Sequence, residues 1–383
     1  MSKALPFRLP APREGRVDLL IVAAEHSGDQ HAARMVRGVL AEKSELRIAA
    51  LGGPALAAAG AQLLENMTAQ STIGFAVFGR LSFYRALIDE VVRWVGQYKP
   101  RAVCFVDSSG LNLRIAKKLF VQGISAKAGG TTKALYYISP QIWASRAKRR
   151  FAMAEHLDGL AAIFPFEVEA YADTNLPVEF VGHPFVAADY KPPVAYDPDG
   201  PVLLLPGSRK GAVKRIFPVL LEAFSRMGGE RKAVTLYPSD ALLWDLQMAN
   251  PPESVEFKKT EERDGPIAAS AVLTTSGTMS MHCALAGIPG AVTYKTDLLT
   301  YWLGRWLVKV EYLGIANLIL KRLMYPEYIQ GAATPESLAR ELELALSDAG
   351  RAEQTRCDAA ELKAMLSSDS AVTAANWMLR QLG

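Results

Sequence analysis

Residues 19–29 read LLIVAAEHSGD, an apolar run of strand length that passes directly into small and polar residues. The next segment, 30–40, carries apolar residues at the spacing of an amphipathic helix. A strand that leads through a short turn into a helix is the repeating unit of parallel α/β sheets. It also brings backbone N–H groups and the positive end of a helix dipole to the carboxyl edge of the sheet, where such sheets bind ligands.

The same alternation continues along most of the chain. Further strand candidates are 48–51, 102–106, 134–138, 159–163, 179–181, 202–205, 233–237, 271–274 and 290–294. Four prolines occur close together where the pattern stops, which is typical of a linker. The sequence therefore predicts two Rossmann-like α/β domains. We expect a loose N-terminal leader at 1–16, a first domain at 17–190, a linker at 191–201, a second domain at 202–345 and C-terminal helices at 346–383.

Composition excludes several classes of protein. The 383 residues are half apolar, as in a globular chain. The net charge of +4 is too small to indicate nucleic-acid binding. The basic clusters 114–118 and 146–150 are interpreted either as solvated helix faces or as attraction to an anionic membrane. Cys104, Cys283 and Cys357 have no spacing that indicates disulfides or a metal site, and a reducing cytoplasm fits them. Residues 265–294 lack charged residues, but their Ser, Thr, Gly and Pro content favours buried strands and a helix over a membrane span.

Two loops of the first domain follow predicted strands. AEHSGD at 24–29 lacks the glycine pattern of a dinucleotide site, and Asp29 is interpreted first as a helix N-terminal residue. GGP at 52–54 either lets the chain approach a ligand closely or serves a tight turn. His183 is interpreted as a buried, hydrogen-bonded side chain or as a residue that lines the interdomain cleft.

Two loops of the second domain also follow predicted strands. In LLPGSR at 204–209, Arg209 is always charged and suits a diphosphate, although an ordinary surface arginine is the alternative. TSGT at 275–278 offers hydroxyls and free N–H groups to a phosphate, or caps the helix expected at 279–286. Both interpretations of this loop can hold together.

Several stretches taken together resemble lipid-A-disaccharide synthase, over roughly residues 17–330. They are AAEHSGD at 23–29, LGGPALAAAG at 51–60, YYISPQIWASR at 136–146, AIFPFEVEAY at 162–171, FVGHP at 180–184, LLPGSR at 204–209, SGT at 276–278 and YKTDLLTYWLGRWLVKVEYLGIANLIL at 294–320. The resemblance implies the GT-B architecture, in which two Rossmann-like domains face each other across a cleft. Its C-terminal helices are expected to pack back across the linker.

The resemblance also implies an inverting glycosyl transfer. A UDP-linked diacylglucosamine would be joined to diacylglucosamine 1-phosphate, giving UDP and lipid A disaccharide 1-phosphate. No metal or cofactor is expected. The first domain would take the acceptor and the second the nucleotide-sugar. We expect a cytoplasmic protein that contacts the inner membrane peripherally and binds no nucleic acid, with a homodimer as one option for its assembly.

By the same resemblance, particular residues receive expected roles. The nucleotide-sugar would be bound by Arg209, Ser208, Ser276, Gly277, Thr278, His282 and Asn317. The stretch 72–84 is crowded with apolar residues, and it is interpreted either as core or as an apolar patch that enters the headgroup region. The acyl-chain substrates favour the patch, made of Ile73, Phe75, Val77, Phe78, Arg80 and Leu81.

Two positions depart from the family pattern. Gly110 stands where the family usually has the aspartate that is its presumed general base. His282 stands where a glutamate usually bonds the ribose of UDP. The candidate bases are then Asp107, His26 and Glu25, with Asp107 ranked first. His26 follows because imidazole titrates near neutral pH. Two rival hypotheses remain open, a GT-B glycosyltransferase or epimerase with a different substrate and a non-catalytic paralogue that binds nucleotide or lipid.

Overall fold

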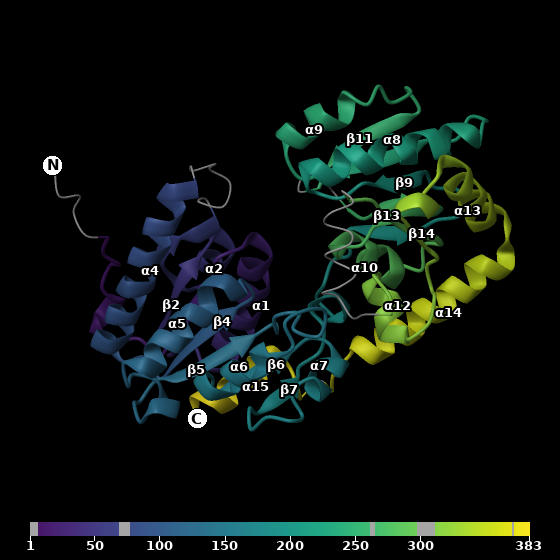
Figure 1. Cartoon of the computed structure of the whole chain (residues 1–383). Coiled ribbons are helices and arrows are strands. Elements are labelled where there is room, and N and C mark those ends of the chain that lie inside the picture. Colours follow the sequence, from purple (N-terminus) through teal and green to yellow (C-terminus); the bar gives the residue numbers. More distant parts are fainter. Residues whose placement is uncertain (1–6, 69–76, 261–264, 297–310, 370) are drawn as a thin grey trace. The chain divides into compact units, whose positions relative to one another are not determined.

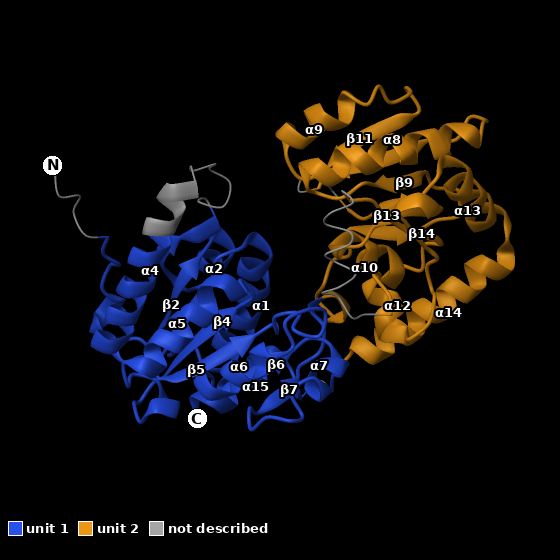
Figure 2. Ribbon diagram, in the orientation of Figure 1, with its two compact units in different colours: residues 1–184, 368–383 blue, residues 185–367 orange. Residues whose placement is uncertain are grey.

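The structure is a computed structural model that describes residues 7–68, 77–260, 265–296, 311–369 and 371–383. The chain divides into two compact units, coloured separately in Figure 2. Unit 1 comprises residues 1–184 and 368–383, and unit 2 comprises residues 185–367.

Unit 1 is built around a parallel sheet with the strand order β3-β2-β1-β4-β5-β6-β7, and helices lie on both of its faces (Figure 1). Its strands are β1 (Leu19–Ala23), β2 (Ile48–Gly52), β3 (Gln62–Asn66), β4 (Ala102–Val106), β5 (Lys133–Tyr137), β6 (Gly159–Ala162) and β7 (Val178–Phe180). Its helices include α1 (His26–Glu42), α2 (Pro54–Ala58), α4 (Val77–Tyr98), α5 (Ser109–Val121), α6 (Arg149–His156), α7 (Pro165–Glu169) and α15 (Ala374–Leu382). The strands β1, β2 and β4 are buried along their whole length, as their apolar sequences predict.

Unit 2 repeats the design with the strand order β11-β10-β9-β13-β14-β15, again parallel. Its strands are β9 (Val202–Leu205), β10 (Ala233–Tyr237), β11 (Val255–Lys259), β13 (Ala271–Thr275), β14 (Gly290–Tyr294) and β15 (Glu327–Ile329). Its helices include α8 (Lys210–Arg226), α9 (Asp240–Gln247), α10 (Thr278–Leu285), α12 (Ile315–Leu320), α13 (Pro335–Ser347) and α14 (Ala349–Leu366). The prediction of two Rossmann-like α/β domains is confirmed.

Strand order reverses once in each sheet, and this reversal positions the candidate sites. In unit 1 the chain runs from β1 to β2 and β3 on one side, and then crosses to β4 on the other side of β1. In unit 2 it runs from β9 to β10 and β11 on one side, and β13 lies on the other side of β9. At such a switch point the two neighbouring connections run in opposite directions and leave a crevice at the carboxyl edge, which is where open α/β sheets bind ligands.

The units do not follow the expected boundaries. The segment 191–201 contains a strand, β8 (Val194–Tyr196), which pairs in parallel with β12 (Ile267–Ala269) and so belongs to unit 2. Residues 7–16 are packed against α4 and not loose. Leu9 is buried, its N–H donates to the Glu90 carboxylate (2.9 Å), and the Trp94 indole donates to the carbonyl of Pro10 (2.9 Å).

Of the C-terminal helices, α13 and α14 stay with unit 2, whereas α15 returns to unit 1 and packs on α1. Trp377 and Met378 of α15 are buried there, and the backbone of Gly38 on α1 lies so close to Ala375 that a β-carbon at Gly38 would stand 2.6 Å from the Ala375 side chain. Unit 1 is therefore made from two distant segments of the chain.

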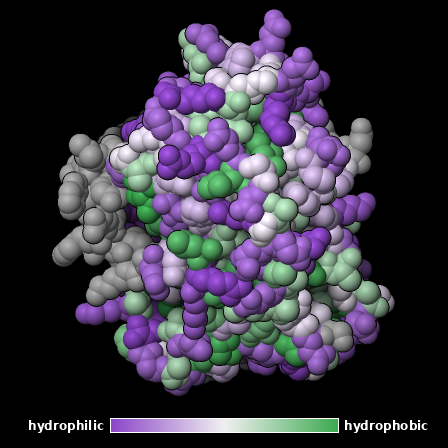
Figure 3. All heavy atoms as spheres, turned by 90° about the vertical axis from the view of Figure 1, so that its right-hand side faces the viewer, coloured by the Kyte–Doolittle hydropathy of each residue, from purple (hydrophilic) through white to green (hydrophobic). Residues whose placement is uncertain are grey.

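The surface of the described residues is mixed in hydropathy on the face that is shown. On the face drawn in Figure 3, hydrophobic atoms are scattered among hydrophilic ones. No helix within the described ranges is both long enough and apolar enough to cross a bilayer. The uncharged stretch 265–294 folds as β12, β13, α10 and β14, as its polar interruptions predict.

Candidate functional site

The first candidate site lies at the carboxyl edge of the unit 1 sheet, where β1 and β4 run side by side. Ala23 is paired with Val106 at the ends of these strands, so the residues that follow them are brought together. The Ser108 hydroxyl donates to Oε1 of Glu25 at 3.3 Å. A β-carbon at Gly28 would lie 3.6 Å from the carbonyl of Val106 and 3.8 Å from the β-carbon of Asp107, which shows how closely α1 approaches β4. Glu25 and Asp107, two of the predicted bases, are thus neighbours.

Asp107 has an unusual backbone. Its φ is 50° and that of Ser108 is 41°, so two successive residues other than glycine lie in the left-handed region. The Asp107 carbonyl accepts hydrogen bonds from the Asn112 amide (2.9 Å) and from the Tyr136 hydroxyl, which hold this conformation. Strain of this kind persists only where the surroundings enforce it, and it gathers at functional sites.

The pKa of the Asp107 carboxyl is also perturbed. Burial raises the pKa of its carboxyl above the ordinary value, and the negative charge of Glu25 raises it further. A carboxylate whose pKa is raised is a stronger base than a free aspartate, as a proton acceptor near neutral pH requires.

The other predicted residues of this edge differ in exposure. Glu25 and His26 are exposed at the start of α1, and Nε2 of His26 lies 3.1 Å from Nε2 of Gln30. Gly110 lies exposed in the first turn of α5, and a β-carbon there would meet nothing within 4 Å. The glycine is therefore required neither by its backbone conformation nor by lack of room.

Asp29 serves a structural purpose. Its carboxylate is fully buried and accepts hydrogen bonds from the backbone N–H groups of Gly53 (2.7 Å), Ala55 (3.0 Å) and Leu56 (3.2 Å). It caps α2 and not its own helix, α1. A β-carbon at Gly53 would lie 2.6 Å from Oδ2 of Asp29, so the glycine of this loop permits a close approach of side chain to backbone.

The second candidate site lies at the carboxyl edge of unit 2, where β9 and β13 are adjacent. Leu205 is paired with Thr274, so LPGSR and TSGT follow these strands side by side. Gly207 has a φ of 93°, and a β-carbon there would lie 3.0 Å from the Thr275 hydroxyl. The two loops predicted to bind the diphosphate therefore touch each other.

The side chains of these loops are open to solvent at the edge. Ser208 and Arg209 are exposed, and Arg209 immediately precedes α8. Ser276 and Gly277 are half-buried, and Thr278 is exposed at the first residue of α10. The Ser276 hydroxyl donates to the carbonyl of Leu313 (2.7 Å), so it also fixes the loop. The N–H of Gly277 donates to the Ser280 hydroxyl (3.3 Å) within the first turn of α10. An arginine and a helix N-terminus that follow neighbouring strands at a switch point are groups that bind phosphate.

Asn317 lies deeper than the resemblance implies. It is fully buried, its amide donates to the carbonyl of Tyr325 (2.7 Å) and to Glu327 (2.8 Å), and its oxygen accepts from the N–H groups of Met324 and Tyr325. Glu327 also accepts from the N–H groups of Leu313 and Gly314. Asn317 and Glu327 together hold the backbone that the Ser276 hydroxyl contacts.

His282 is buried inside unit 2. Its ring packs on Phe185 (centroids 4.0 Å apart) and lies parallel to Tyr190, whose hydroxyl is 3.3 Å from Nε2. The imidazole is thus held by two aromatic neighbours. His183 is likewise buried and packs on Phe164, in agreement with the structural interpretation.

Sequence reasoning missed the half-buried Glu327 and the buried acid Glu167. The side chain of Glu167 is 1% exposed, and burial raises its pKa to about 8. In the sequence it is one of two glutamates within AIFPFEVEAY, shortly after a predicted strand. All side chains of the predicted membrane patch lie outside the part of the chain that the structure describes. Ile73 and Phe75 lie outside the described residues, as do the side chains of Val77, Phe78, Arg80 and Leu81 in the first turns of α4.

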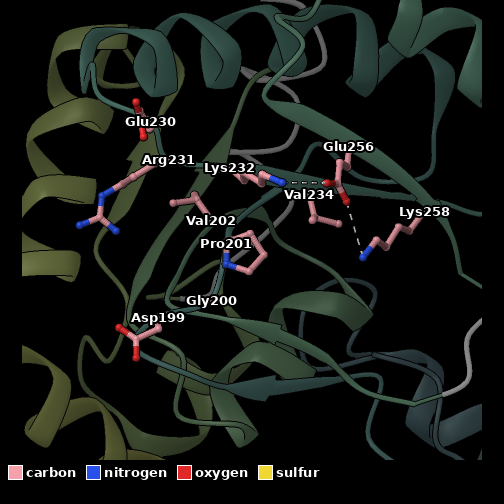
Figure 4. A pocket seen from close by; sticks show the side chains of 10 residues that line it. All are labelled: Asp199, Gly200, Pro201, Val202, Glu230, Arg231, Lys232, Val234, Glu256 and Lys258. Atoms are coloured by element: carbon pink, nitrogen blue, oxygen red, sulfur yellow. Dashed lines mark ion pairs between the residues drawn. The ribbon is translucent and has the colours of Figure 1, made fainter.

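A pocket of unit 2 lies at the opposite edge of its sheet. It has a volume of about 410 Å³ and is lined by residues that precede or begin β9, β10 and β11, drawn in Figure 4. Both Lys232 and Lys258 pair with Glu256 there. Because it lies at the amino ends of the strands, this pocket is separate from the loops of Arg209 and Ser276. Within the described ranges no group of three or more His, Cys, Asp and Glu side chains is arranged to hold a metal.

Known proteins resemble the chain over most of its length. The lipid-A-disaccharide synthetase family model matches residues 19–378. The lipid-A-disaccharide synthase of Nitrosococcus oceani is 34% identical over 336 residues, covering 84% of this chain and 85% of that one. Lipid-A-disaccharide synthase 1 of Legionella pneumophila is 32% identical over 378 residues, covering 94% of this chain and 95% of that one.

Solved structures share the fold at low identity. UDP-GlcNAc 2-epimerase from Neisseria meningitidis has a TM-score of 0.60 at 11% identity, covering 95% of this chain and 99% of its own. The glycotransferase of kitacinnamycin has a TM-score of 0.58 at 14% identity, covering 96% of this chain and 100% of its own. The likeness of these structures concerns the fold alone. By the family match and by relatives above 30% identity along most of their length, the chain belongs to the lipid-A-disaccharide synthetase family and is a UDP-sugar-dependent glycosyltransferase of lipid A biosynthesis.

Proposed function

We propose that the chain transfers the sugar of UDP-2,3-diacylglucosamine to 2,3-diacylglucosamine 1-phosphate and releases UDP. The observation that supports this most directly is the contact between the LPGSR and TSGT loops at the switch point of unit 2, in a chain matched by this family from residue 19 to residue 378. The acceptor's primary hydroxyl attacks the anomeric carbon, a new C–O bond forms, and the bond to the UDP oxygen breaks with inversion. The transition state has oxocarbenium character.

The proton and the leaving group need separate residues. We propose that Asp107 takes the proton of the attacking hydroxyl, with burial and then the charge of Glu25 keeping its pKa high. The negative charge that grows on UDP is met by the Arg209 guanidinium and by the N–H groups of Ser276, Gly277 and Thr278. Since His282 is enclosed by Phe185 and Tyr190, we assign it to the support of α10 and not to the ribose.

We propose that this chemistry needs no metal, because Arg209 and the helix N-termini supply positive charge where UDP departs. Turnover should therefore be unchanged by EDTA and by added Mg²⁺. A loss of activity in EDTA that Mg²⁺ restores would contradict this part of the proposal.

Both substrates carry acyl chains, so we further propose that the enzyme works at the cytoplasmic face of the inner membrane as a peripheral protein. The apolar stretch 72–84, with its basic residues, supports this site of contact. Binding of the protein to vesicles with anionic lipids should fall when Phe75 and Phe78 are replaced by Ser.

The decisive experiment combines a product assay with a binding assay. Incubation with both diacylated substrates should yield UDP and a disaccharide 1-phosphate, seen by thin-layer chromatography. Calorimetry should show that Arg209→Ala weakens UDP binding about tenfold or more, since a charge-assisted bond to a phosphate contributes about 1.5–3 kcal/mol.

Arg231 provides the matched control. It is exposed in unit 2 but lines the pocket at the other edge of the sheet, so Arg231→Ala should leave UDP affinity unchanged. Equal effects of the two substitutions would reject the assignment of Arg209. Binding of UDP without any disaccharide product would instead point to a non-catalytic member of the family.

A further inference from the structure

Unit 1 buries a carboxyl group beneath aromatic rings at the carboxyl edge of its sheet. Glu167 lies on α7, directly after β6, and its neighbours form the aromatic cluster, defined as Trp143, Phe164, Phe166 and His183. Phe164 stacks on Phe166 (centroids 5.5 Å) and His183 packs on Phe164 (5.1 Å). The Trp143 ring meets Phe166 edge-on, 5.2 Å away with an interplanar angle of 88°.

Glu167 connects this cluster to the loop that follows β5. Its Oε2 accepts from the backbone N–H of Phe164 (3.2 Å), and its Oε1 accepts from the indole N–H of Trp143 (3.4 Å). Trp143 is half-buried. A buried acid on one segment therefore sets the orientation of a partly exposed indole on another.

The loop that carries Trp143 is held firmly at its other end. Ile138, the first residue after β5, has a φ of 66°, a conformation that a β-branched residue adopts only under constraint. The hydroxyls of Ser139 and Tyr171 lie 2.9 Å apart and join the start of this loop to the segment after α7. The two contacts that hold the loop, Ser139 with Tyr171 and Trp143 with Glu167, thus both involve residues in α7 or shortly after it.

Burial of Glu167 is costly, which argues for a purpose beyond packing. Desolvation raises its pKa to about 8 although both hydrogen bonds act in the opposite direction. The carboxyl is mostly neutral at pH 7, and an apolar side chain of similar size would fill the space at lower cost. What an apolar side chain would not do is fix the Trp143 indole.

We propose that Glu167 is a positioning residue that holds Trp143 so that its ring face packs on the glucosamine ring of the acceptor. The acceptor named here rests on the proposed function. A sugar ring has an apolar face of C–H groups, and an indole offers a large, rigid surface to it at low entropic cost. The place of Trp143 at the carboxyl edge of β5, in the same sheet as Asp107, suits a ring that orients the acceptor's hydroxyl.

The first test follows the indole N–H signal of Trp143 in two-dimensional ¹H–¹⁵N NMR, identified by its loss in Trp143→Phe. A short-chain diacylglucosamine 1-phosphate should shift this signal and leave that of Trp377 unchanged, because Trp377 is buried in α15. Absence of a shift at saturating acceptor would overturn the proposal. This readout does not require turnover, so a protein that binds acceptor but makes no disaccharide would contradict the proposed function and leave this proposal standing.

The second test is a pH titration of the same signal. In the wild type it should move with a midpoint near pH 8, and in Glu167→Gln it should not. Other groups that face Glu167 are the Tyr171 phenol, whose pKa is also raised by burial, and His183, which packs on Phe164. Both are kept in Glu167→Gln, so a titration that persists in this variant would show that another group controls the indole and would count against Glu167.

The third test separates positioning from folding through kinetics. Glu167→Gln retains an acceptor for the indole N–H, so its KM for the acceptor should stay within about threefold of the wild type. Glu167→Leu removes the bond and should raise that KM roughly tenfold while kcat changes little. Should Glu167→Leu remain folded by circular dichroism with an unchanged KM, the inference fails.

Discussion

At the scale of single residues, the carboxyl edge of the unit 1 sheet brings two acids together. Gly110 stands where the family pattern has an acidic residue, yet the adjacent edge holds Asp107 and Glu25 close together. The left-handed backbone of Asp107 and Ser108 is secured by the bonds from Asn112 and Tyr136. Strain maintained at this cost favours Asp107 as the group that accepts the proton.

The pair makes a prediction about pH. Asp107→Asn should lower turnover at least ~100-fold, the usual loss when a general base is removed. Glu25→Gln removes a negative charge that raises the pKa of Asp107, so that pKa should fall and the base should stay ionised at lower pH. The acidic limb of the kcat/KM profile should therefore move to lower pH, which steady-state assays from pH 4 to 9 measure.

The control for this prediction lies on the same helix. Glu42 is exposed at the far end of α1, so Glu42→Gln changes the net charge equally and should leave the profile in place. If the acidic limb of the kcat/KM profile does not move in Glu25→Gln, or moves to higher pH, then Glu25 does not raise the pKa of the base.

At the scale of elements, two sequence motifs, AAEHSGD and GGP, are joined by a hydrogen bond in unit 1. The aspartate of AAEHSGD, Asp29, caps α2 through the N–H groups of Gly53, Ala55 and Leu56, so α1 and α2 are joined by a single buried carboxylate. An unsatisfied helix end inside a protein is unfavourable, and here another helix supplies the missing acceptor.

Loss of this cap should destabilise unit 1. We expect Asp29→Ala to lower its free energy of unfolding by about 3 kcal/mol, because buried N–H donors lose a charged partner. Asp29→Asn keeps one oxygen and should lose about 1 kcal/mol. Urea unfolding followed by hydrogen exchange of β1 and β2 measures both. Equal stability of the two variants would contradict the capping role.

The first turn of α5 supplies a prediction of opposite sign. Gly110 is exposed there with free space around its α-carbon, and glycine weakens a helix. Gly110→Asp should raise stability by about 0.5–1 kcal/mol through helix propensity and the favourable placement of a negative charge near the positive end of the helix.

Gly110→Asn is its neutral control, of nearly the same size. Its gain should be smaller because the dipole acts on charge, and thermal unfolding of the three proteins at low salt compares them. If Gly110→Asp proves less stable than the parent, the glycine is needed for a reason that its surroundings do not reveal.

At the scale of the whole molecule, the chain order does not match the units. Unit 1 needs α15, which follows all of unit 2 in sequence. Trp377, Met378 and Leu382 of α15 are buried, and the carbonyl of Gln381 accepts a hydrogen bond from the Lys133 ammonium (2.7 Å) at the start of β5. Residues 368–383 are therefore part of unit 1, whose other residues come first in the chain.

Removal of residues 368–383 should unfold unit 1 and spare unit 2. Loss of each large buried side chain typically costs about 2–5 kcal/mol, and three together approach the whole stability of a domain. In hydrogen exchange, β1 and β4 should lose protection while β9 and β13 keep theirs. Trp377→Ala should produce a weaker form of the same pattern. If unit 1 stays protected in the truncated chain, α15 is dispensable.

The sequence by itself determined the parts of this protein that depend on local pattern. Apolar runs identified the central strands, such as β1, β4 and β9, because a strand covered on both faces has no polar positions. The loops after β1, β9 and β13, with Glu25, Arg209 and the residues at 276–278, were found because parallel strands end at one edge of a sheet, whereas Asp107 was found through the resemblance. The resemblance then supplied the family, which the comparisons confirm.

Only the tertiary structure decided which distant residues meet. The edge strands β3, β11 and β15 carry charged residues and are only partly buried, so their sequences have no apolar run to recognise. Likewise, nothing near Asp29 indicates that it caps α2, and nothing near Glu167 indicates Trp143. The return of α15 to unit 1 has the same cause, since an amphipathic helix shows that a face will be buried but not which surface will cover it.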